Sequence, residues 1–551
     1  PTLCFLKEIN EIGACRICVV EASEGGRPAR LVTACVYPVS EGMEVTANSK
    51  KVQDCRRTTL ELILSTHEKK CLSCVRSTNC ELQKMCRDYG VEDSGRYDGF
   101  RPHYELDTSA PHLVRDNNKC ILCRRCVAAC KQQFVSVIGA NDRGIDTHIA
   151  CAFEKPLDET PCVSCGQCIT HCPTGALQER DDTAKVWDAL NDPEKIVIVQ
   201  TAPAVRAALG EEFGLPIGTN VEGKMTAALR RLGFDQVFDT DCAADFTIVE
   251  EANELVERIK TGGTLPMITS CSPGWVKFCE LYYPDQLDHL SSCKSPQNMM
   301  GGLIKTYYAE KNGIDPEKIV SVSVMPCTAK KFEVGREELT ENGLPDVDIS
   351  ITTRELARMI DRAGIKFTAL ADEKFDELLG ESTGAAVIFG ATGGVMEAAL
   401  RTANDWLTGQ SNEAVEFQEV RGTNGLKEAT YTIAGQEIKV AVASGIANAN
   451  YVMSRIQDGT APWTFVEIMC CPGGCVTGGG QPIQPASVLN TMDLKAMRAK
   501  ALYDQDAAMP LRKSHENPTV KTVYADYLGE FGSHKAHEIL HTHYVARKKF
   551  R

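Results

Sequence analysis

The stretch MCCPGGCVTGGGQP, residues 469–482, follows the apolar run Phe465–Ile468 and places three cysteines in or beside a glycine-rich turn. An apolar run of this length that stops at such a turn is typical of a buried strand and the loop after it. Four runs upstream have the same form and end at a proline, a cysteine or glycines: Lys195–Val199, Leu265–Ile268, Val320–Val324 and Ala385–Phe389. Because helical patterns lie between them, the sequence predicts an α/β fold from about residue 195 onward.

Cysteines follow three of these predicted strands. Cys271 lies in TSCSPGW (269–275), Cys327 in MPCTAKK (325–331), and Cys471 and Cys475 in the stretch quoted above. In open α/β sheets, ligands bind just beyond the carboxyl ends of the strands. Cysteines that serve only as small buried apolar residues would be spread through the core instead. The sequence therefore predicts a bound group at this edge of the sheet.

The region before residue 195 contains a cysteine motif that occurs twice. Cys120-x2-Cys123-x2-Cys126-x3-Cys130 recurs as Cys162-x2-Cys165-x2-Cys168-x3-Cys172. This is the spacing of two-cluster bacterial ferredoxins, in which each fourth cysteine binds the other cluster. We expect one [4Fe–4S] cluster on Cys120, Cys123, Cys126 and Cys172, and a second on Cys162, Cys165, Cys168 and Cys130.

Two further ligand sets precede this repeat. Cys4, Cys15, Cys18 and Cys35 can hold a [2Fe–2S] centre, and zinc is the alternative. His67, Cys71, Cys74 and Cys80 follow a predicted helix, Arg57–Thr66, and fit either zinc or a [4Fe–4S] centre.

Composition narrows the classes of function. The formal net charge of −14 argues against nucleic acid or an anionic membrane surface as a partner, and no apolar run is long enough to span a bilayer. Twenty-six cysteines in a long chain with tight Cys-x-x-Cys repeats do not fit a disulfide scaffold, so we expect a reducing, cytoplasmic location. The chain starts at Pro1 without a methionine, and a truncated N-terminus is expected.

The strings TSCSPGW, MPCTAKK and MCCPGGCVTGGGQP resemble the signature of the [FeFe]-hydrogenases, enzymes that make or split H2. The resemblance extends through GGVMEAALR (393–401) and KSHEN (513–517) and covers nearly the whole chain. It implies the multi-cluster form, with one [2Fe–2S] centre, three accessory [4Fe–4S] centres and an H-cluster. The H-cluster is a [4Fe–4S] cube linked to a diiron unit that carries CO, cyanide and a dithiolate amine.

The resemblance also implies a domain organisation. Small α+β ferredoxin-like modules would precede an α/β catalytic domain of two lobes. The expected boundaries are 1–50 for the [2Fe–2S] module, 51–112 for the module with one histidine and three cysteine ligands, 113–185 for the two-cluster module and 186–551 for the catalytic domain.

By resemblance, Cys475 bridges cube and diiron unit, and Cys327 and Cys471 are further cube ligands. Lys330 matches the residue that pairs with a cyanide, which suits a compact ammonium group. The glycines of the 469–482 stretch are expected to let the backbone approach the cluster closely. Six residues match other positions around the diiron unit: Ala202, Pro203, Gln297, Met325, Phe389 and Met469.

The resemblance further implies a proton path through Cys271, Glu251, Ser291 and Glu254. Glu251 and Glu254 are three residues apart on a predicted helix, Ile248–Lys260, and so share a face. Without the resemblance, such a pair would be read as a solvated helix face.

One position departs from the family pattern. The usual motif has two adjacent cysteines, the first a proton donor and the second a cube ligand, but here they read Cys271-Ser272. Cys271 could bind the cube itself, or Ser272 could bind it through oxygen. Alternatively, a nearby thiol such as Cys293 or Cys470 could supply the bond to the cube. The register favours Cys271 as the proton donor.

The resulting hypothesis is reversible reduction of protons to H2, with electrons delivered through the accessory clusters. The expected electron partner is a ferredoxin or a flavin- or NAD(P)-linked subunit. The alternatives are an H2-sensing or impaired relative, or an electron-input subunit of a respiratory or formate dehydrogenase complex.

Overall fold

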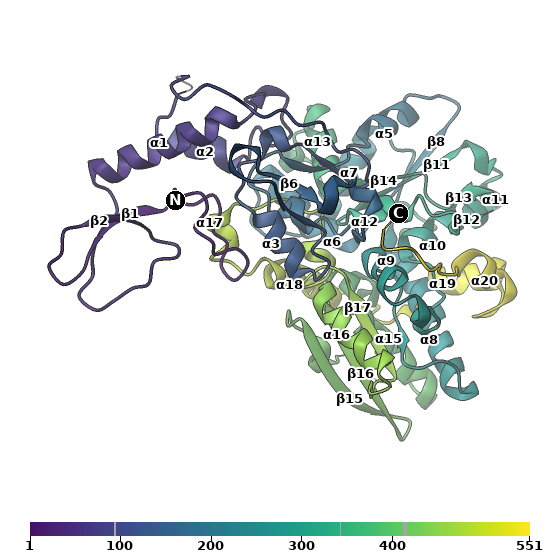
Figure 1. Cartoon of the computed structure of the whole chain (residues 1–551). Coiled ribbons are helices and arrows are strands. Elements are labelled where there is room, and N and C mark those ends of the chain that lie inside the picture. Colours follow the sequence, from purple (N-terminus) through teal and green to yellow (C-terminus); the bar gives the residue numbers. More distant parts are fainter. Residues whose placement is uncertain (93–94, 342, 412–415, 551) are drawn as a thin grey trace.

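The computed structural model describes every residue except 93–94, 342, 412–415 and 551 (Figure 1). The N-terminal modules form an arm at the left of the view, and the hairpin of β15 (Leu426–Ile433) and β16 (Gln436–Ser444) extends at the bottom (Figure 1). Among the described residues, no helix combines the length and apolar character needed to cross a membrane.

The arm begins with a three-stranded antiparallel sheet in the order β2-β1-β3, built from β1 (Val19–Ser23), β2 (Arg30–Thr33) and β3 (Glu44–Thr46). Helices α1 (Lys50–Thr66) and α2 (Glu81–Asp88) follow. The predicted helix Arg57–Thr66 is the second half of α1. The helix starts earlier because the Ser49 hydroxyl accepts a hydrogen bond from the Val52 amide and caps its N-terminus.

The two-cluster region repeats a small unit of one short helix and paired short strands. Its strands pair as β4 with β7 and β5 with β6, both antiparallel. The elements are β4 (Leu113–Arg115), α3 (Arg125–Gln132), β5 (Ile138–Asn141), β6 (His148–Cys151), α4 (Gln167–Thr170) and β7 (Leu177–Glu179). Each helix carries the third cysteine of one repeat.

From residue 195 onward the chain forms two four-stranded sheets. The first has the order β14-β11-β8-β9, entirely parallel, with β8 (Ile196–Thr201), β9 (Gln236–Asp239), β11 (Ile319–Met325) and β14 (Ile349–Thr352). The second has the order β10-β17-β16-β15, parallel except for β15, and includes β10 (Met267–Ile268) and β17 (Phe465–Met469). The predicted α/β character is confirmed, and four of the five predicted strands are present.

The fifth predicted strand, Ala385–Phe389, is wrong. Residues Gly384–Val387 form helix α14, and a single tight turn continues to Gly390. The segment is buried on all sides and packs against α8, α15 and α18. A short run that is apolar all round has no periodicity that distinguishes a buried helix from a buried strand.

The predicted helix Ile248–Lys260 is the second part of α8 (Thr240–Thr261). Its first two turns are buried all round and therefore lack an amphipathic pattern. The Asp239 carboxylate caps this longer helix by accepting a hydrogen bond from the Asp241 amide.

The remaining helices cover or connect the two sheets. They are α5 (Thr183–Leu190), α6 (Pro203–Arg206), α7 (Glu222–Leu232), α9 (Pro273–Tyr282), α10 (Pro296–Leu303), α11 (Ala309–Asn312), α12 (Ala329–Glu333), α13 (Thr353–Arg362), α15 (Gly394–Thr408), α16 (Ile446–Gln457), α17 (Ala486–Leu489), α18 (Leu494–Ala508), α19 (Pro518–Val523) and α20 (His534–Leu540). A two-stranded hairpin joins β12 (Thr340–Glu341) to β13 (Leu344–Pro345).

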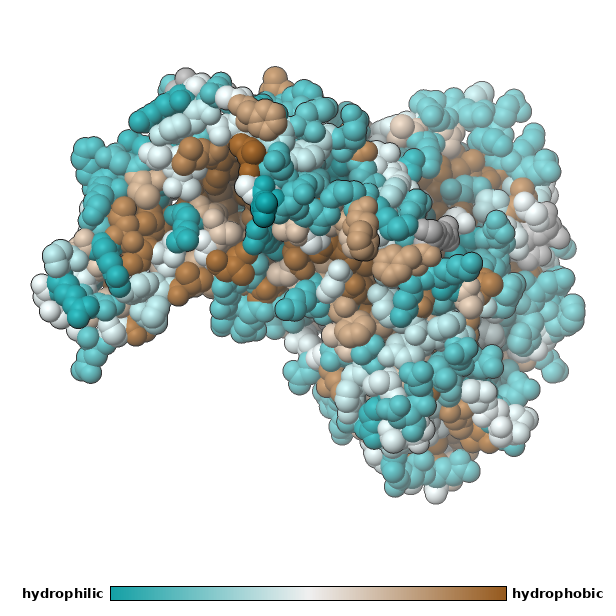
Figure 2. All heavy atoms as spheres, viewed as in Figure 1, coloured by the Kyte–Doolittle hydropathy of each residue, from teal (hydrophilic) through white to brown (hydrophobic). Residues whose placement is uncertain are grey.

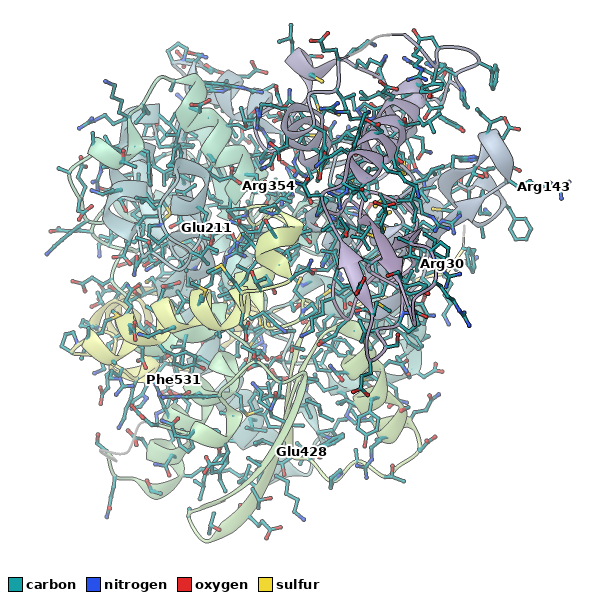
Figure 3. All side chains as sticks on the ribbon, turned by 90° about the vertical axis from the view of Figure 1, so that its left-hand side faces the viewer. Arg30, Arg143, Glu211, Arg354, Glu428 and Phe531 are labelled. Atoms are coloured by element: carbon teal, nitrogen blue, oxygen red, sulfur yellow. The ribbon has the colours of Figure 1, made fainter. Side chains whose placement is uncertain are left out.

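Buried polar contacts fix the two-cluster region against the first sheet. Arg354 on α13 donates hydrogen bonds of 3.0 and 2.6 Å to Glu179 on β7, and Arg354 lies where the N-terminal ribbon meets the rest of the chain (Figure 3). The Thr328 hydroxyl donates to the Ser164 carbonyl at 2.8 Å, and the Gln133 side chain donates to the Cys470 carbonyl at 3.0 Å. The second cysteine repeat is therefore held beside the loops that follow β11 and β17.

Candidate metal centre and proton path

One largely apolar cavity lies where strands of both sheets end. Concave, mostly apolar sites with a few converging polar groups are typical of ligand and cofactor sites. It brings together every residue that the sequence placed around the diiron unit and the cube: Ala202, Pro203, Cys271, Gln297, Met325, Cys327, Lys330, Phe389, Met469, Cys471 and Cys475.

The elements that carry these side chains explain their convergence. Cys271 follows β10, Cys327 follows β11, and Cys471 and Cys475 follow β17. Ala202 and Pro203 follow β8, where Pro203 occupies the first position of α6. Phe389 reaches the cavity from the turn after α14, so its placement is correct although the predicted strand is not.

Burial dominates the electrostatics of the cysteines. It raises the pKa of Cys475 to about 12, with a smaller contribution from the neighbouring Cys471 thiol. Burial also raises the pKa of Cys327, again with Cys471 as the next contributor. Three thiols that act on one another inside one apolar cavity form a soft, all-sulfur donor set, which suits iron–sulfur clusters and not oxygen-seeking cations.

Lys330 is buried and held in place by two contacts. Its Nζ donates a 2.8 Å hydrogen bond to Oε2 of Glu333 and a 3.3 Å hydrogen bond to the carbonyl of Cys271. The ammonium group therefore stands at the cavity wall beside the chain segment that carries Cys271, where it can attract a small anion.

Glu333 is an organising residue that the sequence reasoning missed. The same Oε2 atom accepts hydrogen bonds from the Ser295 hydroxyl and the Gln297 amide, both at 3.0 Å. Glu333 thus ties α12 to α10 and fixes two residues of the cavity wall. The available signal was its spacing three residues after Lys330, on one face of a helix.

Two glycines of the 469–482 stretch also allow close contact between loops. A Cβ on Gly478 would lie 2.1 Å from the Pro326 carbonyl oxygen, and one on Gly479 would lie 2.3 Å from the Cys165 carbonyl oxygen. These glycines let three loops approach one another by backbone contact, and by doing so they bring the cysteines of different loops together.

The predicted proton path runs along one face of α8. Glu251 is fully buried, and within the described part of the chain neither of its carboxylate oxygens has a hydrogen-bond partner. Burial raises the pKa of Glu251 to about 8, and the neighbouring Glu254 adds to the shift. Burial also raises the pKa of Cys271, with the Glu251 carboxylate as the next contributor, so the two groups interact electrostatically.

The outer part of the path is hydrogen-bonded. The Ser291 hydroxyl, fully buried, donates to Oε2 of Glu254 at 2.8 Å, and Arg258 donates to Oε1 at 2.6 Å. The side chain of Glu254 is 15% exposed. A solvated helix face is therefore excluded for Glu251, and the pair leads from the buried thiol to the surface.

The cysteines of the two-cluster region gather in crossed sets. The pKa of Cys126 is raised by burial and then by Cys123, Cys120 and Cys172. The pKa of Cys168 is raised by burial and then by Cys165, Cys162 and Cys130. Each fourth cysteine thus lies with the other repeat. His112, which the sequence reasoning did not single out, places Nε2 3.7 Å from the Cys162 sulfur.

The first ligand set is also assembled. The Cys15 amide donates to the Cys4 sulfur at 3.4 Å, and a hydrogen bond between these two thiols lowers the pKa of Cys15 to about 5. Burial raises the pKa of Cys35 to about 12, and a hydrogen bond with Cys18 adds to it.

In the second set, Cys74 is one of the groups that raise the pKa of Cys80. Cys80 and Cys71 in turn add to the raised pKa of Cys86. His67 is buried, its Nδ1 has no hydrogen-bond partner among the described residues, and burial lowers its pKa to about 4. The imidazole is therefore neutral at pH 7, which is the form that binds a metal.

The two thiols considered for the departure at position 272 lie in different places. Cys470 and Ser272 both line the cavity. Cys293 lies with Ser270 and Lys294 at a separate, smaller cavity, and its sulfur is 4.0 Å from the Glu254 carboxylate.

Family models match nearly the whole chain. The model described as "Iron only hydrogenase large subunit, C-terminal domain" matches residues 195–479, and "Iron hydrogenase small subunit" matches 492–547. Before them, a "2Fe-2S iron-sulfur cluster binding domain" matches 1–50, an "NADH-ubiquinone oxidoreductase-G iron-sulfur binding region" matches 56–95, and a "4Fe-4S dicluster domain" matches 119–176.

Individual proteins agree with these models. The NADP-reducing hydrogenase subunit HndD of Solidesulfovibrio fructosivorans is 49% identical, over 100% of this chain and 94% of that protein. Iron hydrogenase 1 of Clostridium pasteurianum is 45% identical, over 98% of this chain and 94% of that protein. A solved structure of [FeFe]-hydrogenase HydA1 from Chlamydomonas reinhardtii is 41% identical, covers 66% of this chain and 98% of its own, and superposes with a TM-score of 0.59. The chain therefore belongs to the iron-only, or [FeFe], hydrogenase family and is a hydrogenase with iron–sulfur domains at its N-terminal end.

Proposed function

We propose that this hydrogenase carries out 2H⁺ + 2e⁻ ⇌ H2 in the cavity lined by Cys271, Cys327, Cys471 and Cys475. The observation that carries the proposal is the convergence of residues from distant parts of the sequence on that single cavity, with a buried carboxyl group behind it. When bound, the iron cluster supplies the open iron site at which protons and electrons combine.

The protein's own residues supply and move the proton. The Cys271 thiol remains protonated at neutral pH because burial raises its pKa, so its Sγ can donate a proton. Glu251 can reload it, because a pKa of about 8 lies close to the working pH. Ser291 and Glu254 then connect Glu251 to solvent through the 2.8 Å hydrogen bond between them.

The side chains around the cavity exclude water and hold the cluster in position. Phe389, Met325 and Met469 give it an apolar wall, and Ala202, Pro203 and Gln297 complete it. Lys330, fixed by Glu333, presents a compact ammonium group suited to a cyanide anion.

The N-terminal ligand sets serve as an electron route. We assign one [2Fe–2S] centre to Cys4, Cys15, Cys18 and Cys35, one [4Fe–4S] centre to His67, Cys71, Cys74 and Cys80, and two [4Fe–4S] centres to the crossed sets. The cluster of Cys162, Cys165, Cys168 and Cys130 would be the last before the cavity, since Cys165 lines it. The domain boundaries 1–50, 51–112, 113–185 and 186–551 and the division of the catalytic domain into two lobes, one for each sheet, belong to this proposal.

The electron partner is assigned to the NAD(P)-linked class, with a free ferredoxin as the alternative. The relative HndD is named as a subunit of an NADP-reducing hydrogenase. Most of the large exposed apolar side chains lie on the N-terminal modules, among them Val39, Leu72 and Phe153, and apolar residues gather on this part of the surface (Figure 2). Such a surface suits a protein partner. We place the enzyme in the cytoplasm, a reducing compartment that suits its cysteine ligands.

The experiment is H2 evolution by the anaerobic, fully matured enzyme with Cys271→Ala. We expect turnover to fall by well over about tenfold while every cluster stays bound, because the proton donor is lost. Cys242→Ala removes another fully buried thiol, one on α8 that does not line the cavity, and serves as the matched control. Full activity in Cys271→Ala would refute the path, and loss of iron from it would make Cys271 a ligand instead.

A further inference from the structure

Position 272 leaves the cluster one cysteine short of the family's ligand set. Ser272 lines the cavity, and its hydroxyl oxygen accepts a 3.1 Å hydrogen bond from the main-chain amide of Cys470. An alcohol oxygen is a poor ligand for iron in a sulfide cube, which prefers thiolate. The fourth donor must come from a different residue.

Cys470 is placed to provide it. The residue is 5% exposed and lines the same cavity as Cys327, Cys471 and Cys475. The thiols of Cys471 and Cys165, which line the same cavity, are its neighbours. It therefore stands between a predicted ligand of the cube and a predicted ligand of the adjacent accessory cluster.

The residue at 274 leaves room for this thiol. A Cβ on Gly274 would lie only 2.6 Å from the Cys470 sulfur, so any larger residue at that position would displace it. Positions 272, 274 and 470 thus form one set. Ser272 holds the Cys470 backbone, Gly274 makes space for the side chain, and Cys470 adds a sulfur to the wall.

The other candidate thiols have different surroundings. Cys293 lies outside the cavity and beside Ser291 and Glu254, with its sulfur 4.0 Å from the Glu254 carboxylate. Cys271 belongs to the apolar cluster of Phe389 and Met469 and interacts electrostatically with Glu251, on the side of the proposed proton path. Cys470, in contrast, neighbours Cys471 and Cys165 in the cavity wall.

We propose that Cys470 is the fourth thiolate ligand of the [4Fe–4S] cube, in place of the residue at position 272. Binding removes the proton of its Sγ–H to solvent and forms one sulfur–iron bond, and no electron changes hands. The inference rests on the proposed function only in placing the cube in this cavity. It leaves Cys271 free as proton donor and sets a cube ligand directly against Cys165 of the accessory cluster.

The test counts clusters in the full-length anaerobic protein. Iron, acid-labile sulfide and the electron paramagnetic resonance of the reduced protein are measured for Cys470→Ala, Ser272→Ala and the control Cys279→Ala, which removes a fully buried thiol from α9. Cys470→Ala is expected to lose about four irons per chain and the cube's signal, while the accessory signals remain. Cys279→Ala is expected to keep all its iron. Ser272→Ala is expected to keep it too, because it removes one hydrogen bond to the Cys470 amide but no iron ligand.

The second part of the test moves the proposed cysteine ligand from position 470 to position 272. Combining Ser272→Cys with Cys470→Ala is expected to restore the cube, and Gly274→Ala is expected to disturb the cube in the native background but not in this combination. The difference between the effects of Gly274→Ala on the cube in these two backgrounds measures the coupling between positions 274 and 470. It also keeps the proposal testable if Cys470→Ala alone fails to fold.

Three results would overturn the assignment: full iron with an unchanged cube signal in Cys470→Ala, loss of the cube in Ser272→Ala, or loss of an accessory signal instead of the cube's. None of these readouts depends on H2 turnover. A protein with the expected cluster counts but no H2 chemistry would contradict the proposed function and leave the ligand assignment standing.

Discussion

The hydroxyl of Ser291 donates a 2.8 Å hydrogen bond to Oε2 of Glu254, and this contact joins the buried part of the proposed proton path to the protein surface. Ser291 is fully buried, whereas the Glu254 side chain is 15% exposed and is held by Arg258 at 2.6 Å. Farther inside, both carboxylate oxygens of Glu251 lack a hydrogen-bond partner among the described residues. In the proposed path, a proton that moves between Cys271 and solvent passes through this carboxyl group.

Glu251→Gln should cut turnover by about 10²-fold or more, because the amide preserves the shape but cannot exchange a proton at neutral pH. Hydrogen evolution at saturating electron donor measures this, with cluster content checked by iron analysis. Glu257→Gln, at an exposed position of the same helix, is the control and should retain native turnover. Native turnover in Glu251→Gln would remove Glu251 from the path.

The same residue should shape the pH dependence of stability. Its pKa in the folded protein, about 8, lies above the value of about 4.3 expected in the unfolded chain. The folded state then holds a proton that the unfolded state releases, so the contribution of Glu251 to stability is fully present below about pH 4 and is lost as pH rises toward 8. Glu251→Gln should lack this loss, which thermal unfolding at about pH 5.5 and about pH 8 would reveal. An identical pH slope in variant and native protein would contradict the raised pKa.

Glu333→Gln should destabilise the cavity wall. It leaves the buried Lys330 ammonium without its 2.8 Å carboxylate partner, and removing one member of a buried ion pair costs about 3–5 kcal/mol. The melting temperature reports this, with the exposed Glu337→Gln on the following segment as the control. Equal melting temperatures for the two variants would mean that Glu333 does not hold Lys330.

Replacing Arg354 should destabilise the contact between the two-cluster region and the first sheet more than replacing Arg358 does. Arg354 and Arg358 both pair with Glu179, but the Arg354 side chain is 7% exposed and that of Arg358 is 21% exposed. Arg354 also donates to the Gln481 carbonyl at 2.6 Å. Arg354→Met should therefore cost about 3 kcal/mol or more and Arg358→Met about 1 kcal/mol. Thermal unfolding compares the pair, and a larger loss in Arg358→Met would contradict this ranking.

The sequence predicted the parts of the site that depend on strand ends. Cys271, Cys327 and Cys471 each follow a parallel strand, and such strands bring their carboxyl ends to one edge wherever the sheet forms. Features that depend on packing between distant segments could not be predicted from the sequence. Ala385–Phe389 is apolar all round and became a helix, and Glu333 has a role only because α12 and α10 meet. The choice between Cys293 and Cys470 likewise required the folded chain, since both are buried cysteines of equal standing in the sequence.

The most direct test of the central claim is infrared spectroscopy of the anaerobic, fully matured protein. If Cys327, Cys471 and Cys475 hold the hydrogenase cluster in one cavity, bands of iron-bound CO and cyanide will appear in the native chain and vanish in Cys475→Ala, while the accessory clusters remain. Absence of these bands from native protein that carries its full complement of iron–sulfur clusters would contradict the account.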